Sequence, residues 1–221
     1  MINNKIQQIL PLELREARNR KDFVVGESNQ EAVKWIDKYP KWSSNGLIIV
    51  GPKASGKSHL TFVWQKKSSC EIVDYKEVDS ESKKLLNFKN LAIENIHKIT
   101  NFKFLLHVFN IKKERKLNLL LTSRLSINKL SIALQDIRSR LIALPQANIL
   151  HPTDDIIKGT LLKLFRDKGI FLSVDLINYI FIRIERTHSS VTRFVSEVDK
   201  LSLREKKNIT IPLIKKVIQN K

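Results

Sequence analysis

Two glycines, a lysine and a serine in one short segment have the spacing of a phosphate-binding loop. The segment reads GPKASGKS, in which Gly51, Gly56, Lys57 and Ser58 fit the pattern GxxxxGK[ST]. It follows the apolar run LIIV and precedes a stretch of helical length, an order that lets backbone amides and the positive helix end surround an anion. We expect Lys57 to neutralise the outer phosphates and the Ser58 hydroxyl to bind Mg²⁺. The sequence therefore predicts a nucleotide site.

A second pair of polar residues stands at the end of another apolar run. The run NLAIENI (90–96) contains Glu94 and Asn95. Nucleotide hydrolysis needs an acidic residue near such a strand end to hold Mg²⁺ and a second group to orient the attacking water. Glu94 can fill the first role, or it can be no more than a cap of the strand end. Asn95 can orient a water but cannot withdraw its proton, so we predict tight binding and slow turnover.

Short apolar runs alternate with amphipathic stretches between residues 16 and 150. The runs with the composition of buried strands are GLIIV (46–50), EIVDY (71–75), NLAIENI (90–96) and LNLLLTS (117–123). Stretches of helical length separate them, such as KSHLTFVWQKK and FKFLLHVFNIKKE. This alternation predicts an α/β region, in which helices cover both faces of a parallel sheet.

The pattern becomes wholly helical from residue 151 to residue 221, where we predict three or four helices. The residues expected at helix ends are Thr153, Ser173 and Ser190 as N-caps, Gly169 as a C-cap, and Pro212 in the first turn of the last helix.

Composition excludes several classes of protein. No run of about 18 apolar residues is present, so we predict no membrane span, and the N-terminus has no apolar core of signal-peptide length. The one cysteine, Cys70, excludes an internal disulfide and suits a reducing cytoplasm. The five histidines have no ligand spacing, so we predict no zinc site.

The charge balance is strongly basic. Forty Lys and Arg residues against 22 Asp and Glu residues give a net charge of +18, which favours an acidic partner such as DNA. The basic residues are spread along the whole chain, however, and the chain is also rich in Ile and Asn. A compositional bias therefore explains the charge as well as direct DNA contact does.

Several segments together resemble the branch of AAA+ ATPases that contains the replication initiator DnaA and its shorter relative Hda. The matching segments are DFVVGESNQEA (22–32), GPKASGKSHL (51–60), LLLTSR (119–124), LQDIRSRL (134–141) and SSVTRFVSEVDKL (189–201). The resemblance covers residues 20–221. It implies a P-loop AAA+ fold, which is an α/β base (16–150) with a parallel five-stranded sheet and helices on both faces, followed by a small all-helical lid (151–221).

The resemblance also implies roles for individual residues. Those implied in binding ADP or ATP are Val24, Val25, Gly51, Pro52, Ser55, Gly56, Lys57, Ser58, His59, Ser123 and Arg193. Ser58 and Glu94 are implied as Mg²⁺ ligands. Arg140 is implied as an arginine finger that acts on a nucleotide held by a neighbouring subunit, with Arg138 as the back-up candidate. Arg124 after the Thr-Ser pair and Asn95 after Glu94 both depart from the family pattern, which puts hydrolysis by this chain in doubt.

The first fifteen residues form a tail with a short apolar motif, QQILPL. Gln7, Leu10, Pro11 and Leu12 have the spacing of a peptide ligand, and members of the Hda group carry such a motif to dock on the DNA polymerase sliding clamp. A hydrophobic staple onto the chain's own core is the alternative.

The resemblance implies a regulator that, with the DNA-loaded clamp, promotes hydrolysis of DnaA-bound ATP and so switches the initiator off. Two alternatives stay open. One is a shortened initiator or helicase loader that acts directly on DNA, and the other is a scaffold adaptor that stimulates no hydrolysis. The sequence leaves open the oligomeric state and whether ADP or ATP is the resident nucleotide.

Overall fold

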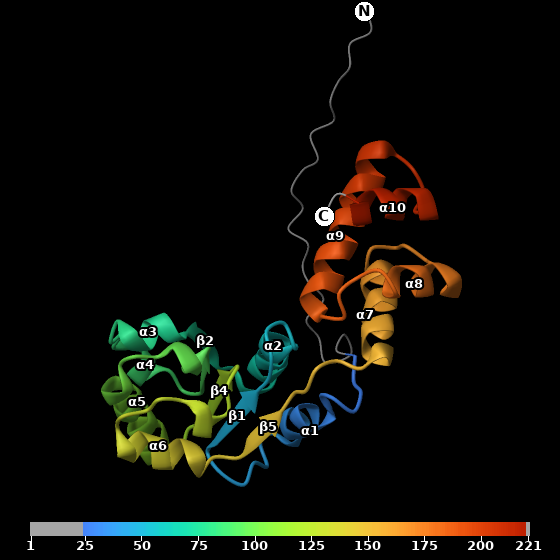
Figure 1. The fold of residues 1–221 in the computed structure, drawn as a ribbon. Helices are drawn as coiled ribbons and strands as arrows, with labels where there is room; N and C mark the ends of the chain where they lie inside the picture. Colours follow the sequence, from blue (N-terminus) through green and yellow to red (C-terminus); the bar gives the residue numbers. More distant parts are fainter. Residues whose placement is uncertain (1–23, 220–221) are drawn as a thin grey trace, which may run out of the picture.

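The structure is a computed structural model that describes residues 24–219. The predicted clamp-binding motif, with Gln7, Leu10, Pro11 and Leu12, lies outside these residues and stays a prediction. The described chain forms an α/β base and a separate helical lid that stands beside it, joined by the segment after the last strand (Figure 1).

The base is built on a parallel five-stranded sheet, which confirms the predicted fold class. The strands lie in the order β2-β3-β4-β1-β5, and every pair is parallel. Their bounds are β1 (Gly46–Val50), β2 (Glu71–Asp74), β3 (Leu91–Glu94), β4 (Leu119–Ser123) and β5 (Gln146–Asn148). All residues of β1 and β4 are buried, because these central strands are covered on both faces. The predicted strands extended one or two residues too far, since Tyr75 already belongs to a helix and β3 begins only at Leu91.

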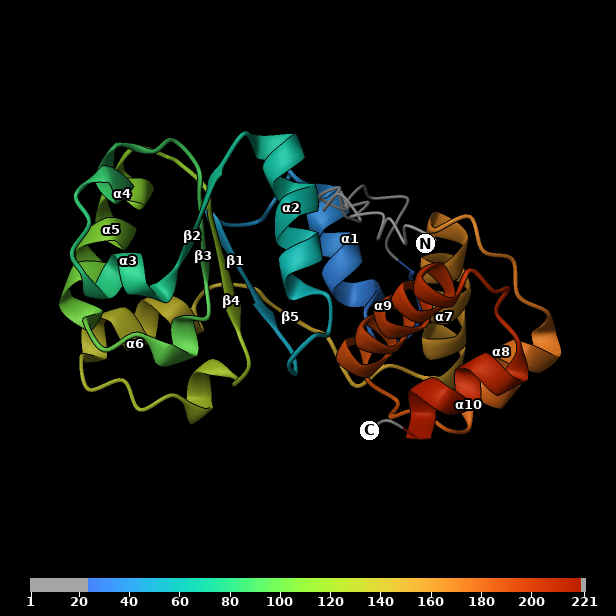
Figure 2. The ribbon, with the colours of Figure 1, turned by 90° about the horizontal axis from the view of Figure 1, so that it is seen from above.

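Helices cover the two faces of the sheet separately (Figure 2). The helices α1 (Gln30–Lys38) and α2 (Lys57–Ser68) pack with Leu47 and Ile49 of β1 into one core. Ile48 and Val50 point to the opposite face, as alternation along a strand requires. That face is covered by α3 (Tyr75–Asp79), α4 (Lys84–Asn87), α5 (Phe102–Glu114) and α6 (Gln135–Ile142), with the 3-10 turns η2 (Ile96–Lys98) and η3 (Ile127–Lys129) beside them.

The lid has four helices around a core of its own. They are α7 (Asp154–Asp167), α8 (Val174–Phe181), α9 (His188–Glu205) and α10 (Ile211–Gln219). The central helix α9 contributes Val191, Phe194, Val195 and Val198 to this core. Pro212 stands in the first turn of α10, as predicted.

One predicted helix N-cap is wrong, and another is confirmed in its position although its side chain makes no capping bond. The prediction of Ser190 as an N-cap is wrong, because Thr187 caps α9 by accepting a hydrogen bond from the Ser190 amide at 3.1 Å. Ser190 lies inside the helix, buried, and its hydroxyl donates to Glu185. Thr153 stands at the N-cap position of α7, but its side chain makes no capping bond.

The other two predicted ends agree more closely. Ser173 caps α8 through its side chain, as predicted. The C-cap of α7 is Lys168 rather than Gly169, and Gly169 follows it with a φ of 73°. This left-handed backbone is the conformation that favours glycine just after a helix.

Candidate functional site

The phosphate loop lies between the carboxyl end of β1 and the first turn of α2. A Cβ built on Gly51 lies 2.8 Å from the Ile149 carbonyl oxygen and 2.9 Å from the Ser55 Oγ, so the loop is packed too closely there for any side chain. Gly56 has a φ of 94° at the N-cap of α2, which only glycine adopts at low cost. Both motif glycines therefore stand where the backbone requires them.

Lys57 is buried and holds the loop together. Its Nζ donates to the carbonyl oxygens of Gly51 at 2.7 Å and Pro52 at 2.6 Å, and it lies 3.4 Å from the Ser55 hydroxyl. The pKa of Lys57 is lowered to about 8, mainly by burial and in addition by the charge of Arg124, while Glu94 opposes the shift. The ammonium group thus lies in the concave side of the loop, where the motif predicts phosphate oxygens.

The motif residues after Lys57 lie in the first turn of α2 and are more exposed than Lys57. Ser58 is exposed in the first turn of α2, and His59 beside it is half-buried. The structure therefore brings together Gly51, Pro52, Ser55, Gly56, Lys57, Ser58 and His59 in one continuous loop and helix start.

The ends of β2 and β3 carry polar side chains at the same edge of the sheet as this loop. Asn95 has a left-handed φ of 62°, its Nδ2 donates to the Asp74 Oδ2 at 2.8 Å, and its amide donates to the Thr122 Oγ1 at 3.2 Å. Glu94 is half-buried, and its Oε1 is buried with no hydrogen-bond partner among the described residues. A buried carboxylate oxygen without a donor fits a cation or a water bound to one.

The end of β4 lies between the end of β3 and the phosphate loop that follows β1. The Gly51 amide donates to the Ser123 carbonyl at 3.1 Å, so the strand end is tied to the phosphate loop. Ser123 is buried, and its hydroxyl donates to the Leu125 carbonyl at 2.6 Å. Arg124 between them is exposed, and its amide donates to the His97 Nδ1 at 3.3 Å.

The segment from Val24 to Ser28 runs between the base and α7 of the lid. The Val24 carbonyl accepts a hydrogen bond from the Asn29 side chain at 2.8 Å, and Val25 is 45% exposed. A Cβ built on Gly159 of α7 lies 3.3 Å from Val24 Cγ1, which shows that this segment touches the lid. Val24, one of the predicted adenine-binding residues, is therefore at the junction of the base and the lid.

The helices that carry Arg193 and Arg140, α9 and α6, lie on opposite sides of the molecule. Arg193 is exposed on α9, whose N-terminal end is the part of that helix nearest the phosphate loop in Figures 1 and 2. Arg140 lies on α6, which both views place on the side of the base away from the lid. Its guanidinium carbon is 5.8 Å from the centroid of the Phe109 ring, and the side chain is half-exposed. Arg138 is also half-exposed, but its Nε is buried without a partner among residues 24–219.

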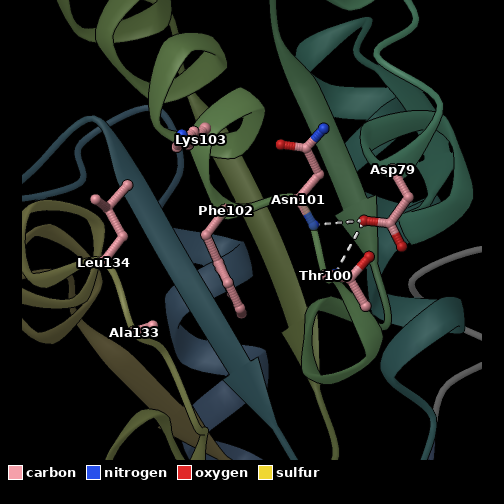
Figure 3. Close-up of a pocket in the computed structure, with 7 residues that line it drawn as sticks. All are labelled: Asp79, Thr100, Asn101, Phe102, Lys103, Ala133 and Leu134. Carbon is pink, nitrogen blue, oxygen red and sulfur yellow. Dashed lines mark hydrogen bonds between the residues drawn. The ribbon is translucent and has the colours of Figure 1, made fainter.

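A shallow cavity of about 600 Å³ lies elsewhere on the base, at the start of α5 (Figure 3). The Asp79 carboxylate at its edge already accepts hydrogen bonds from the amides of Thr100 and Asn101, each at 3.0 Å. None of the predicted site residues lines it. The cavity is therefore not the nucleotide site.

Sequence reasoning missed Asp74 and His97 and gave Arg124 no role in binding. Asp74 is the last residue of β2, His97 lies in the turn after β3, and Arg124 directly follows β4, so all three are at the carboxyl edge of the sheet, as the phosphate loop is. Asp74 could have been found in the sequence, because it stands near the end of a predicted strand. The strand order, which brings these strand ends together, could not be predicted from the sequence pattern.

Within the described residues, two further features are absent. No group of three His, Cys, Asp or Glu side chains there has an arrangement that could hold a metal ion. None of the helices between residues 24 and 219 has the length and apolar character needed to cross a membrane.

Comparison with known proteins agrees with the fold and the lid. Residues 158–218 match the family model described as the Hda lid domain. The structure superposes on domain III of the Thermotoga maritima replication initiation protein DnaA with a TM-score of 0.79 and 18% identity, covering 92% of this chain and 96% of that one. The lid segment is therefore similar to that of Hda, and the chain has the fold of DnaA domain III.

Further comparisons find the same fold in other solved structures and one related sequence. AMPPCP-bound DnaA from Aquifex aeolicus matches with a TM-score of 0.72 and 16% identity over 87% of this chain and 68% of that one. A RuvB variant of Thermotoga maritima matches with a TM-score of 0.70 and 14% identity, over 89% of this chain and 70% of that one. An uncharacterized protein of Haemophilus influenzae is 28% identical over 190 residues, 78% of this chain and 80% of its own length.

Proposed function

We propose that this chain binds an adenine nucleotide in its phosphate loop and acts as a negative regulator of replication initiation. With the DNA-loaded sliding clamp, it promotes hydrolysis of ATP bound to DnaA. The nucleotide on this chain sets the position of the lid, and Arg140 acts on the partner's ATP. The match of residues 158–218 to the Hda lid domain supports DnaA as the partner. The similarity to AMPPCP-bound DnaA supports the binding of an adenine nucleotide.

The residues around the loop fit a magnesium nucleotide. Lys57 and the start of α2 offer positive charge to the phosphates, and the exposed Ser58 hydroxyl is free of steric cover. The unpartnered Glu94 Oε1 supplies the hard oxygen that Mg²⁺ prefers. When bound, the ion neutralises phosphate charge. Because Asn95 is engaged with Asp74 and carries no carboxylate, this chain's own turnover is slow.

The position of Arg140 is the observation that carries the proposal. It belongs to α6, which lies on the opposite side of the base from the lid, so we expect Arg140 not to serve the nucleotide held by its own loop. A half-exposed guanidinium next to the Phe109 ring is accessible to a second subunit. A planar, permanent charge is suited to stabilising a phosphoryl-transfer transition state in a neighbouring subunit.

The rate of hydrolysis of DnaA-bound ATP, measured with and without the clamp, tests this function. The proposal predicts acceleration only with the chain, the clamp and DNA together, and loss of the acceleration when residues 1–12 are deleted or Gln7, Leu10 and Leu12 become alanine. Acceleration that is equal without the clamp contradicts the tethering role of the tail.

The net charge of +18 favours one rival function, direct action on DNA as a shortened initiator or helicase loader. That function predicts salt-dependent DNA binding without any clamp, which disappears when nucleotide is removed. The other alternative is a scaffold adaptor. Deletion of residues 1–12 removes all activity of such an adaptor, whereas replacement of Arg140 by alanine removes none.

A further inference from the structure

The connections that lead into β1, β2, β3 and β4 meet at the edge of the sheet at which the strands begin, opposite the phosphate loop (Figure 2). Each of the helices α1, α2, α4 and α5 ends there with a basic residue in its last turn. Several exposed cations of this edge form no ion pair within residues 24–219. We call them the basic edge, and they are Lys38, Lys41, Lys89, Lys113, Arg115 and Lys116.

Acidic side chains are divided unevenly between the two edges of the sheet. Beside the basic edge, Asp37 is paired with Lys67 at 2.9 Å, which leaves Glu71 and Glu114 as the exposed acids of these connections. The edge at which the strands end has carboxylates in or after β2, β3 and β4, namely Asp74, Asp79, Glu94 and Asp136. A compositional bias adds lysine to both edges, but it does not account for where the carboxylates lie. The arrangement therefore favours an anionic partner at the basic edge.

Hydrogen bonds join the connections of the basic edge into one surface. The Asn90 Nδ2 donates to the Ser68 carbonyl oxygen at 2.9 Å, and the Asn90 Oδ1 accepts from the Asn118 amide at 2.9 Å. The Leu119 amide donates to the Asn45 carbonyl oxygen at 2.9 Å. The segments that lead into β2, β3, β4 and β1 are thus tied to one another. Because the backbone that carries the cations is fixed, little ordering is needed when a ligand binds.

The spacing of the cations fits a chain of phosphates better than a single one. Lys41, Lys89 and Lys116 precede β1, β3 and β4, which are neighbours in the order β3-β4-β1. Neighbouring strands lie about 4.8 Å apart, so these three strand starts span about 10 Å. That span is wider than one phosphate group, whereas duplex DNA carries one negative charge per about 1.7 Å of its axis.

We propose that the basic edge binds the phosphate backbone of duplex DNA, without reading its sequence and without requiring the nucleotide in the phosphate loop. The choice of DNA among polyanions rests on the proposed function, in which the clamp holds this chain beside duplex DNA. Contacts to phosphates position a protein on DNA but carry no sequence information. The phosphate loop lies at the other edge of the sheet, so its occupancy leaves the basic edge unchanged.

Fluorescence anisotropy of a labelled duplex, titrated with the full chain in the absence of clamp, tests the inference. Wild-type affinity is expected to fall steeply between about 50 and 200 mM salt. A triple variant with Lys41→Gln, Lys89→Gln and Lys116→Gln removes a phosphate contact at each position. The slope of log binding constant against log salt concentration is expected to become shallower by about 3, and the affinity at low salt to fall at least about tenfold.

The matched control removes the same charge from the edge at which the strands end. It combines Lys76→Gln, Lys103→Gln and Lys129→Gln, which also replace exposed lysines of the base. This control is expected to keep the wild-type slope and an affinity within about threefold of the wild type, because salt screens charges more than about 10 Å away. Both variants change only exposed side chains, so both should keep the wild-type Tm, and omission of nucleotide should leave DNA binding unchanged.

The contrary outcomes are distinct. A wild-type slope in the basic-edge variant, or equal losses in the two variants, overturns the inference, because this edge then has no special role. Loss of DNA binding when nucleotide is omitted overturns it in favour of the initiator-type rival. Binding to phosphatidylserine vesicles but not to the duplex overturns it in favour of a lipid surface. A chain that binds DNA as expected but does not stimulate hydrolysis of DnaA-bound ATP contradicts only the proposed function.

Discussion

Replacing Gly51 with alanine tests how closely the phosphate loop is packed. The added methyl carbon lies 2.8 Å from the Ile149 carbonyl oxygen, 2.9 Å from Ile149 Cβ and 2.9 Å from the Ser55 Oγ. Two of these three atoms belong to or adjoin buried backbone, so the loop itself must move. Overpacking of this kind costs about 1–3 kcal/mol of folding free energy. For a chain of this size, each kcal/mol lowers the Tm by about 2–4 °C.

The same shift also weakens nucleotide binding, because the Gly51 carbonyl is one of the two oxygens that orient Lys57. We expect ADP affinity to fall by about tenfold or more, measured by calorimetry below the Tm of the variant. Gly169→Ala is the control. Its φ of 73° makes alanine cost about 1 kcal/mol, but no atom lies within 4 Å, and it should leave ADP binding unchanged. A Gly51→Ala protein with wild-type Tm and Kd refutes the packing argument.

Two further predictions concern the lid. Burial lowers the pKa of His188 in the folded protein below its unfolded value, so the unfolded chain binds more protons near pH 6. The free energy of unfolding should therefore fall as the pH drops below about 6.5, and His188→Gln should reduce this slope in denaturant melts at pH 5 and pH 7.5. Lys168 pairs with Asp199 across α7 and α9, and both side chains are largely buried at 15% and 20% exposure. Lys168→Met should cost about 1–2 kcal/mol in the same melts, whereas Lys163→Met, whose partner lies on its own helix, should cost less.

The sheet was predictable because its central strands are buried on both faces. Such strands appear in the sequence as unbroken apolar runs, as GLIIV and LNLLLTS do. The last strand, β5, was not found among those runs. It has only three residues, Gln146–Asn148, of which only Ala147 is buried, and its pairing with β1 rather than its composition makes it a strand.

The candidate site was predictable where its residues are contiguous. The phosphate loop is a single segment, so the spacing of its glycines, lysine and serine along the chain is enough to predict phosphate binding. Asp74, His97 and Arg124 come from three strand ends, and only the order β2-β3-β4-β1 brings them to the loop. The misplaced cap of α9 has a similar cause. Thr187 and Ser190 both suit a helix start, and it is the Thr187 side chain that accepts the capping hydrogen bond, from the Ser190 amide.

The most direct test of the regulatory account is single-turnover hydrolysis of DnaA-bound ATP with clamp, DNA and either wild-type chain or Arg140→Ala. An arginine finger contributes about 10³–10⁵ in rate, so the variant should lose nearly all stimulation while its ADP affinity and clamp binding match the wild type. Arg204→Ala, far from α6, should stimulate fully. Full stimulation by Arg140→Ala contradicts the account, because some other group then completes the partner's site.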